Sequence, residues 1–252
     1  MAGTLAFVYG TLAYTLFLGV FLYLIGFLGN VFVPKSIDSP AQTASGVALL
    51  VNLLLVSVFG LQHTVMARVR FKEWWTRFVP HPIERSTYVL FTCLVLGLIF
   101  WQWRPMPGVI WEVESFAGRV SLWALFWTGW ALVLLSTFLI DHFDLFGMRQ
   151  VHLYARGRAY RHLDFQISGL YRYVRHPLLL GFLITFWVTP LMTVGHLVFA
   201  AAMTTYILVA VQFEERDLAR FYGKPYEDYR RRVPMLVPIP RAAKTRVPEV
   251  SR

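Results

Sequence analysis

Long apolar runs without charge alternate with short basic segments along this chain. Asp, Glu, Lys and Arg are absent from five windows, at residues 1–34, 39–67, 86–103, 120–140 and 177–213. A helix that crosses a membrane needs about 20 consecutive, mainly apolar residues, so each of the first four windows has the length for one span. We predict spans at residues 5–31, 47–66, 87–103 and 120–140.

The fifth window is too long for one helix and short for two. Residues 178–189 would give only about 18 Å of helix at 1.5 Å per residue, whereas the hydrocarbon core is about 30 Å thick. Thr189 then precedes Pro190, and proline disfavours helical conformation in the residue before it. Residues 196–213 return as a second apolar run. We expect a helical hairpin whose first limb is too short to span, with a turn that other parts of the protein shelter.

The segment after the hairpin mixes basic and aromatic residues between positions 215 and 232. Gly223 and Pro225 argue against one unbroken helix, and we expect an interfacial segment that caps the bundle. Residues 241–252 are polar and are expected to be a disordered tail. The predicted fold is therefore all-α: one integral membrane domain at residues 1–240, a polytopic bundle of four transmembrane helices with a C-terminal hairpin and a cap.

Composition and charge support and orient this bundle. The chain is 57% hydrophobic and only 15% charged, whereas a soluble protein carries about 25% charged residues. Of the 24 Lys and Arg residues, 21 fall in connections on one predicted face. The positive-inside rule places that face, with both termini, in the cytoplasm. The formal net charge of +10 then indicates topology and attraction to anionic lipid, not nucleic-acid binding. The lone cysteine, Cys93, excludes an internal disulfide, and an apolar buried thiol is inert.

Two polar elements flank the hairpin, which brings them to the same side of the membrane. The first contains Arg172, Arg175 and His176, and the second begins with Glu214 and Glu215. Charges in such positions often only reach toward lipid headgroups. A matched basic and acidic pair at the two ends of one hairpin favours a ligand site instead.

These elements resemble the S-adenosylmethionine site of the isoprenylcysteine carboxyl methyltransferase superfamily. The matching positions are Tyr171, Arg172, Tyr173, Arg175, His176, Pro177 and Gly181, followed by Glu214, Glu215, Leu218, Phe221, Gly223, Tyr226 and Tyr229. Leu179 stands where many members carry an aromatic residue. The resemblance implies that Arg172 or Arg175 meets the cofactor carboxylate in a charge-assisted hydrogen bond. It also implies that Glu214 or Glu215 takes the ammonium or the ribose hydroxyls, and that Tyr222 or Tyr226 stacks on adenine.

Two further polar groups are predicted at the same face. Gln62 and His63 lie at the end of the second span, and Asp141, His142 and Asp144 follow the fourth. Ionisable groups at a membrane face are candidates for function, although an isolated histidine is more often a hydrogen-bonded packing residue.

The strings around these groups narrow the resemblance. Leu-Gln-His-Thr-Val-Met-Ala-Arg, Ile-Glu-Arg-Ser-Thr-Tyr-Val-Leu and Asp-His-Phe-Asp-Leu-Phe-Gly-Met-Arg-Gln are similar to the bacterial membrane-bound methanethiol S-methyltransferases, and denitrification-linked membrane proteins share parts of them. The likeness covers most of the chain and implies an enzyme of the bacterial inner membrane. It would make dimethyl sulfide from methanethiol, a small apolar thiol, with S-adenosylmethionine as cofactor. Substrate contacts are then expected from Gln62, Arg85, Asp144 and Arg149.

The thiol must lose its proton, because the thiolate is the nucleophile. His63 and His142 are the candidate bases, with Asp141 or Asp144 as orienting groups, and the sequence does not choose between them. No His-Glu-x-x-His or Cys-x-x-Cys spacing indicates a metal. Three alternatives remain: a carboxyl methyltransferase for prenylated cysteine, a sterol reductase with a nicotinamide cofactor, and a haem-binding protein with His63 and His142 as axial ligands. The oligomeric state does not follow from the sequence.

Overall fold

The computed structural model describes residues 1–40 and 43–238, and most of these residues are helical. Five helices are long and apolar enough to cross a membrane: α1 (Ala2–Gly29), α2 (Ser45–Ala67), α4 (His81–Gln102), α5 (Phe116–Ile140) and α9 (Val194–Tyr222). The predicted polytopic bundle is thus confirmed, and its first four spans match α1, α2, α4 and α5 closely. The predicted tail at residues 241–252 lies outside the described residues.

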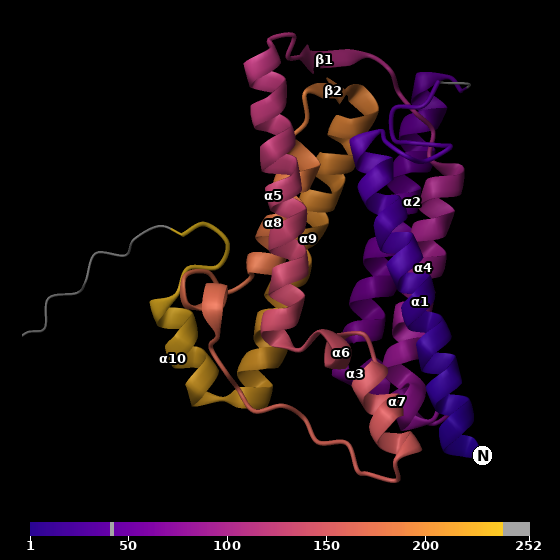
Figure 1. Ribbon diagram of the computed structural model, residues 1–252, viewed down its shortest axis with the longest axis vertical. Helices are drawn as coiled ribbons and strands as arrows, with labels where there is room; N and C mark the ends of the chain where they lie inside the picture. The colour runs from indigo at the N-terminus through magenta and orange to yellow at the C-terminus, as the bar shows by residue number, and fades with distance from the viewer. Residues whose placement is uncertain (41–42, 239–252) are drawn as a thin grey trace, which may run out of the picture.

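The long helices stand in two groups side by side (Figure 1). One group contains α1, α2 and α4, and the other contains α5, α9 and the shorter α8 (Pro177–Trp187). Within the groups α1 and α2 pack on α4, and α5 packs on α8, whereas α2 and α9 form the main backbone contact between the groups. Large rings fill the space between them, and Phe27, Trp103 and Phe199 are fully buried.

The first limb of the hairpin is short, as predicted. Helix α8 has 11 residues and begins with Pro177, whose fixed φ suits the first turn of a helix. A Cβ on Gly181 would lie 2.8 Å from the carbonyl oxygen of Gly129 in α5. Only glycine therefore lets the backbones of α5 and α8 approach this closely, and the short limb is held against a full-length span.

The far end of the bundle, opposite the N terminus, carries a small sheet that the sequence did not predict (Figure 1). Strand β1 (Val109–Glu112) pairs antiparallel with β2 (Leu191–Thr193), and Val109 lies opposite Thr193. Strands of four and three residues are too short to leave an alternating pattern. The sheet satisfies the backbone of the hairpin turn, which was expected to need shelter.

A partly buried polar cluster fastens the loop after α1 to this far end. The Asp38 carboxylate accepts a hydrogen bond from Asn30 Nδ2 at 2.8 Å and another from the Thr193 hydroxyl, and His196 Nδ1 lies 3.9 Å away. Burial alone would raise the pKa of Asp38, but His196, Thr193 and Asn30 outweigh it and lower that pKa below its ordinary value. The carboxylate therefore stays charged and keeps its partners.

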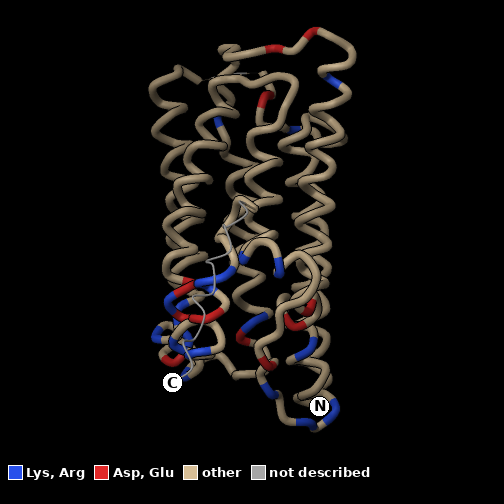
Figure 2. The backbone as a smooth tube through the Cα atoms, turned by 90° about the vertical axis from the view of Figure 1, so that its left-hand side faces the viewer, with Lys and Arg blue, Asp and Glu red and all other residues tan. Residues whose placement is uncertain are grey.

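The opposite end holds the N terminus and most of the charge, as Figure 2 shows. Its short elements are α3 (Val69–Trp75), α6 (His142–Leu145), α7 (Met148–Ala155), the 3-10 turn η1 (Gly169–Arg172) and α10 (Lys224–Arg232). Helix α9 continues nine residues beyond the predicted end at position 213, to Tyr222. Gly223 then ends it with a φ of 63°, and α10 starts with Pro225 in its first turn. The predicted break is at this point.

Candidate active site

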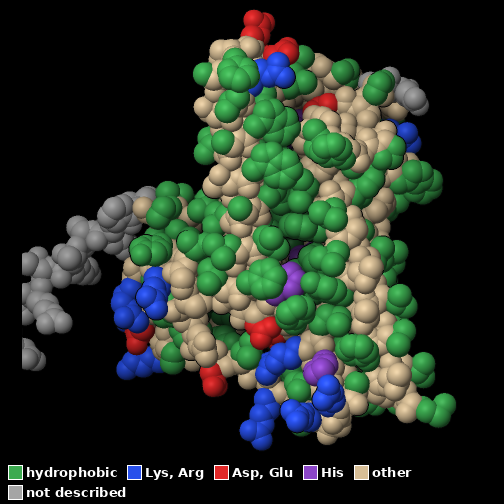
Figure 3. All heavy atoms as spheres, viewed as in Figure 1, with side chains coloured by type: hydrophobic (Ala, Val, Ile, Leu, Met, Phe, Trp, Pro, Cys, Tyr) green, Lys and Arg blue, Asp and Glu red, His purple; other side chains and the backbone are tan. Residues whose placement is uncertain are grey.

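A large cavity lies between the two helix groups, toward the charged end. Its volume is about 1630 Å³, above the roughly 300–1,000 Å³ of common ligand pockets, so it has room for a cofactor and a small second substrate. In Figure 3 charged side chains gather around a hollow at this end of the molecule, below a mainly apolar surface. The cavity wall combines residues from α1, α2, α4, α5, α8 and α9 with the loop before η1.

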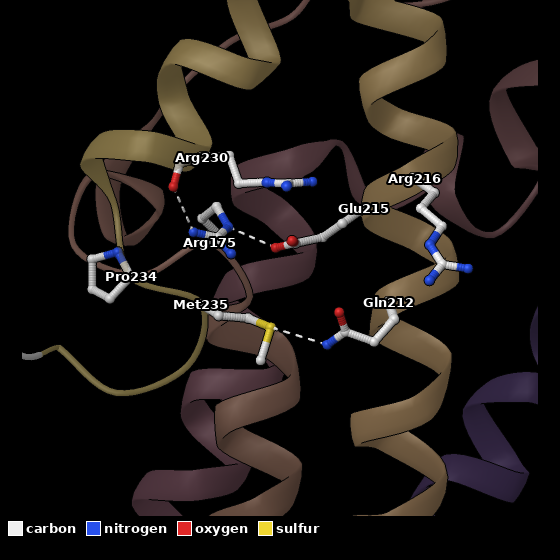
Figure 4. A pocket seen from close by; sticks show the side chains of 7 residues that line it. All are labelled: Arg175, Gln212, Glu215, Arg216, Arg230, Pro234 and Met235. Carbon is white, nitrogen blue, oxygen red and sulfur yellow. Dashed lines mark hydrogen bonds and ion pairs between the residues drawn. The ribbon is translucent and has the colours of Figure 1, made fainter.

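The two polar ends of the hairpin meet in a buried network. Arg175 Nε donates to Glu215 Oε1 at 2.6 Å, and His176 Nε2 lies 3.1 Å from the same oxygen. Arg175 also donates to the backbone carbonyls of Arg230, at 3.0 Å, and Val233. Figure 4 shows the arginine and the glutamate pointing toward one another from different elements. Arg175 is thus committed to partners within the protein and fixes α10 against the hairpin.

This network separates the large cavity from a smaller pocket of about 540 Å³. Arg175 and Glu215 line the small pocket (Figure 4). Arg175 and His176 line the large cavity, which Glu215 does not. The adjacent Glu214 lines the large cavity. No described side chain forms an ion pair or a hydrogen bond with the Glu214 carboxylate. Of the two predicted acidic residues, Glu214 is therefore the one free to meet a ligand.

Tyrosines form the wall beside Glu214. Tyr171, Tyr222 and Tyr226 all line the large cavity. Tyr222 donates to the Leu163 carbonyl at 3.2 Å, but the buried Tyr226 hydroxyl has no hydrogen-bond partner among the described residues. Burial raises the pKa of Tyr226, and that of Tyr171, so both hydroxyls keep their protons. The Tyr226 hydroxyl is a buried polar group without a partner, and such groups usually acquire one from a ligand or water.

Two cations stand on the opposite wall. Lys72 on α3 and Arg85 on α4 line the cavity, and neither forms an ion pair with a described carboxylate. Burial and the neighbouring Arg85 lower the pKa of Lys72. Arg85 Nε donates to the Leu145 carbonyl at 2.8 Å, and its guanidinium lies over the Tyr88 ring. Two nearby carboxylates act on the pKa of Lys72 in the opposite direction but form no ion pair with it. Two adjacent cations without an ion-paired carboxylate make a place for the carboxylate of a ligand. The sequence reasoning missed Lys72, which only the fold of α3 brings here.

Several predicted positions lie outside the cavity wall. Arg172 is exposed on η1, Pro177 is buried at the start of α8, and Gly181 is used in the contact with α5. Gln62 donates to the Met66 sulfur at 3.2 Å. Arg149 forms an ion pair with Asp144 at 3.0 Å.

His63 lies in the cavity wall between two hydroxyl groups. Its Nδ1 is 3.2 Å from Thr92 Oγ1, and its Nε2 is 2.7 Å from the Tyr88 hydroxyl. The Thr92 hydroxyl donates its own proton to the Tyr88 carbonyl, so the threonine oxygen accepts from Nδ1–H. Nε2 is then the unprotonated nitrogen of a neutral ring and accepts from Tyr88.

His142 repeats this arrangement on the other side of the cavity. Its Nδ1 is 2.8 Å from Thr137 Oγ1, whose proton goes to the Leu134 carbonyl, and its Nε2 is 2.7 Å from the Tyr14 hydroxyl. Burial lowers the pKa of His142, so the ring is neutral near pH 7. Because both nitrogens of both rings are engaged, neither histidine offers a free ligand to a haem iron.

The expected orienting carboxylates contact neither ring. Asp141 lines the cavity and accepts from the Asp144 amide at 2.9 Å, which caps α6. Asp144, also in the cavity wall, forms an ion pair with Arg149 and accepts a hydrogen bond from the Tyr160 hydroxyl at 3.2 Å. Burial and Asp144 raise the pKa of Tyr160 to about 12.

The groups that orient the histidines are thus tyrosine and threonine hydroxyls, which the sequence reasoning missed. Tyr88 and Thr92 are four residues apart in a span, a spacing that places two side chains on one face of a helix. This spacing was the one feature of the sequence that could have indicated Tyr88 and Thr92 as partners of a histidine. Tyr14 gave none, because it is 128 residues away from His142.

Comparison with known proteins gives close relatives. The chain is 58% identical over 236 residues to the methanethiol S-methyltransferase of Mycobacterium tuberculosis, which covers 94% of this chain and 97% of the relative. It is 52% identical over 238 residues to the protein of the same name from Crocosphaera subtropica, covering 94% and 93%. A more distant relative is Nurim of Bos taurus, 31% identical over 180 residues and 68% of each chain. No family model and no solved structure matches the chain.

Proposed function

Because the chain belongs to the methanethiol S-methyltransferase family and is itself a methyltransferase, we propose that it methylates methanethiol with S-adenosylmethionine in the large cavity. The observation that carries the proposal is a set of polar groups in that cavity: three charged side chains without an ion-pair partner among the described residues, and one hydroxyl without a hydrogen-bond partner there. Glu214 and the Tyr226 hydroxyl stand on one wall, and Lys72 and Arg85 stand on the other.

These groups fit the amino-acid part and the ribose of the cofactor. Glu214 is the partner for the ammonium group, and Lys72 with Arg85 is the partner for the carboxylate, since hydrogen bonds between charged groups are the strong ones. The Tyr226 hydroxyl is placed to bind a ribose hydroxyl or a ring nitrogen. Arg175 and His176 keep the wall in shape through Glu215, and the rings of Tyr171 and Tyr222 offer a surface for adenine.

The chemistry suits a cavity with a mostly apolar lining. S-adenosylmethionine supplies a sulfonium methyl group: the thiolate sulfur forms a new S–CH3 bond as the old one breaks, and its electron pair stays on the departing sulfur of S-adenosylhomocysteine. Opposite charges disappear in this step, so a site that excludes water does not oppose it as bulk water does. Phe17, Phe21, Phe59 and Phe146 are among the rings that exclude water here.

The thiol proton has a path through this chain's own residues. In both histidine sites the unprotonated Nε2 accepts from a tyrosine hydroxyl. Tyr88 lines the cavity, so its oxygen can take the thiol proton while its own proton passes to His63 Nε2. His142 lines the cavity itself, whereas its partner Tyr14 does not, so His142 would have to take the thiol proton directly. A positioned acid–base group of this kind contributes about 10²- to 10⁴-fold to a rate.

The test is direct. Purified protein in detergent receives methanethiol and S-adenosylmethionine labelled at the methyl group, and labelled dimethyl sulfide is measured in the headspace. We expect turnover by the wild type, and a loss of S-adenosylmethionine binding in Glu214→Ala with the fold intact. A wild-type protein that binds the cofactor but makes no dimethyl sulfide would refute the substrate, and one that binds no cofactor would refute the site.

A further inference from the structure

The cavity reaches the surface of the bundle at two places of different character. Toward the charged end its wall contains exposed polar residues, among them His81 and Arg158. On the side of α1 and α5 its wall contains leucines that face the membrane, Leu18 and Leu134. The first opening suits a charged molecule from water, and the second suits an apolar one from lipid.

The lateral opening, which we call the side window, is framed by two contacts that α1 makes, one with α5 and one with α6. On one edge the rings of Phe21 and Trp130 meet edge to face with centroids 5.3 Å apart. On the other edge the Tyr14 hydroxyl is hydrogen-bonded to His142 at 2.7 Å. Tyr14 and Phe21 are seven residues apart on α1, which corresponds to a height of about 10 Å.

Neighbouring leucines show that the window is local. Leu134 and Leu135 are 49% and 50% exposed, but only Leu134 lines the cavity. Leu18 and Leu16 are 39% and 41% exposed, and only Leu18 lines it. A side chain that is half exposed on a spanning helix and also lines the cavity lies where the cavity meets the lipid. Leu18 lies on α1 and Leu134 on α5, within the stretches that the two framing contacts join.

We propose that the thiol enters the active site from the bilayer through the side window, between Leu18 and Leu134. This inference rests on the proposed function. A small apolar thiol concentrates in the membrane, whereas the charged cofactor cannot cross lipid and must use the polar opening. The two substrates then reach the cavity by different routes. His142 and Thr137 form the edge of the window, so the thiol passes a candidate base as it enters.

The test narrows the window and compares each variant with its matched neighbour. Leu134→Trp and Leu18→Trp place a large ring in the window, whereas Leu135→Trp and Leu16→Trp place the same ring on nearby lipid-facing surface. In proteoliposomes we expect the window variants to raise the KM for methanethiol by about tenfold, a change of about 1.4 kcal/mol. The kcat and the affinity for S-adenosylmethionine should stay unchanged, because saturating thiol overcomes slow entry. The control variants should match the wild type.

A widening variant tests the same idea in the opposite direction. Leu134→Ala should raise kcat/KM for butanethiol relative to methanethiol, and Leu135→Ala should not. Unchanged cofactor affinity shows that each variant is folded. Equal KM values in Leu134→Trp and Leu135→Trp, with wild-type turnover present, would overturn the side window alone. A wild type without methyl transfer to any thiol would instead refute the proposed function, and this inference with it.

Discussion

Adjacent glutamates at the end of the hairpin should have separable effects on folding and on cofactor binding. Glu215 is buried against Arg175 and His176, whereas Glu214 faces the large cavity without a described partner. We expect Glu215→Ala to destabilise the protein and Glu214→Ala to weaken cofactor binding. Both variants remove one carboxylate from adjacent positions of α9, and the two carboxylates face different sides of the helix. Each variant is therefore the control for the other.

The expected sizes follow from the contacts. Glu215→Ala leaves the Arg175 guanidinium buried with only two carbonyl partners, and removing one member of a buried ion pair costs about 3–5 kcal/mol. In a chain of this size such a loss lowers Tm by roughly 6–20 °C. Glu214→Ala should change Tm by about 2 °C or less. It removes a charged hydrogen bond to the cofactor worth about 1.5–3 kcal/mol, which raises Kd about 10- to 100-fold.

The assay combines thermal unfolding by tryptophan fluorescence in detergent with calorimetric titration of S-adenosylmethionine. Glu215→Gln keeps a hydrogen-bond acceptor for Arg175 and should recover part of the lost Tm. A Tm for Glu215→Ala that equals the wild-type value would show that the buried network does not hold the hairpin. A Kd for Glu214→Ala that equals the wild-type value would remove Glu214 from the cofactor site.

Further outcomes can be measured independently. If His63 or His142 takes the thiol proton, its alanine variant should lose about 10²- to 10⁴-fold in kcat. The loss in kcat should be smaller at alkaline pH, because the solvent then supplies thiolate. A loss that does not depend on pH contradicts base catalysis. Tyr88→Phe should reproduce the His63→Ala profile and leave cofactor Kd unchanged; full activity excludes the relay through Tyr88. Asp38, whose pKa is lowered in the folded protein, contributes stability above its unfolded pKa of about 3.9 that is lost as pH falls through the folded value. The Tm of Asp38→Asn should therefore fall less than that of the wild type between pH 5 and pH 3, and an equal fall contradicts this. A topology reporter fused after residue 156 should report the cytoplasm, as the positive-inside rule requires, and a periplasmic signal would refute the proposed orientation.

The spans could be predicted because lipid demands long runs without charge, and the hairpin because Pro190 interrupts one such run. The same topology predicted that the basic and acidic elements of the hairpin lie at one face. The ion pair between Arg175 and Glu215 was not predicted, because both residues were expected to contact the cofactor. Choosing between Glu214 and Glu215, or between Arg172 and Arg175, did not follow. Neighbouring residues on a helix point about 100° apart, since 3.6 residues make a turn, and only the rotation of α9 decides which glutamate faces the cavity. Arg172 ends η1, whereas Arg175 lies in the turn before α8, and the path of that turn decides which arginine is buried.

The partners of the histidines were harder to predict for another reason. Tyr14 and His142 lie on helices that are far apart in the sequence, and a single tyrosine in an apolar span has no distinctive neighbours. Lys72 was overlooked because a basic residue in a connection predicted to be cytoplasmic is expected from topology alone. Its place in the cavity depends on how α3 turns back after α2.

Helix α9 is fastened at both ends, and this has a consequence for how the protein moves. Its 29 residues make a rod of about 43 Å. Near one end His196 Nε2 donates to the Phe186 carbonyl of α8 at 3.0 Å, and near the other Glu215 holds the residues that begin α8. Helix α5 is in turn held against α8 by the close glycine contact. Helices α5, α8 and α9 therefore form one rigid unit. A movement that opens the cavity to ligands is therefore expected in α1, α2 and α4, or in α10, which can rotate about Gly223. Bending of the hairpin is not expected to contribute.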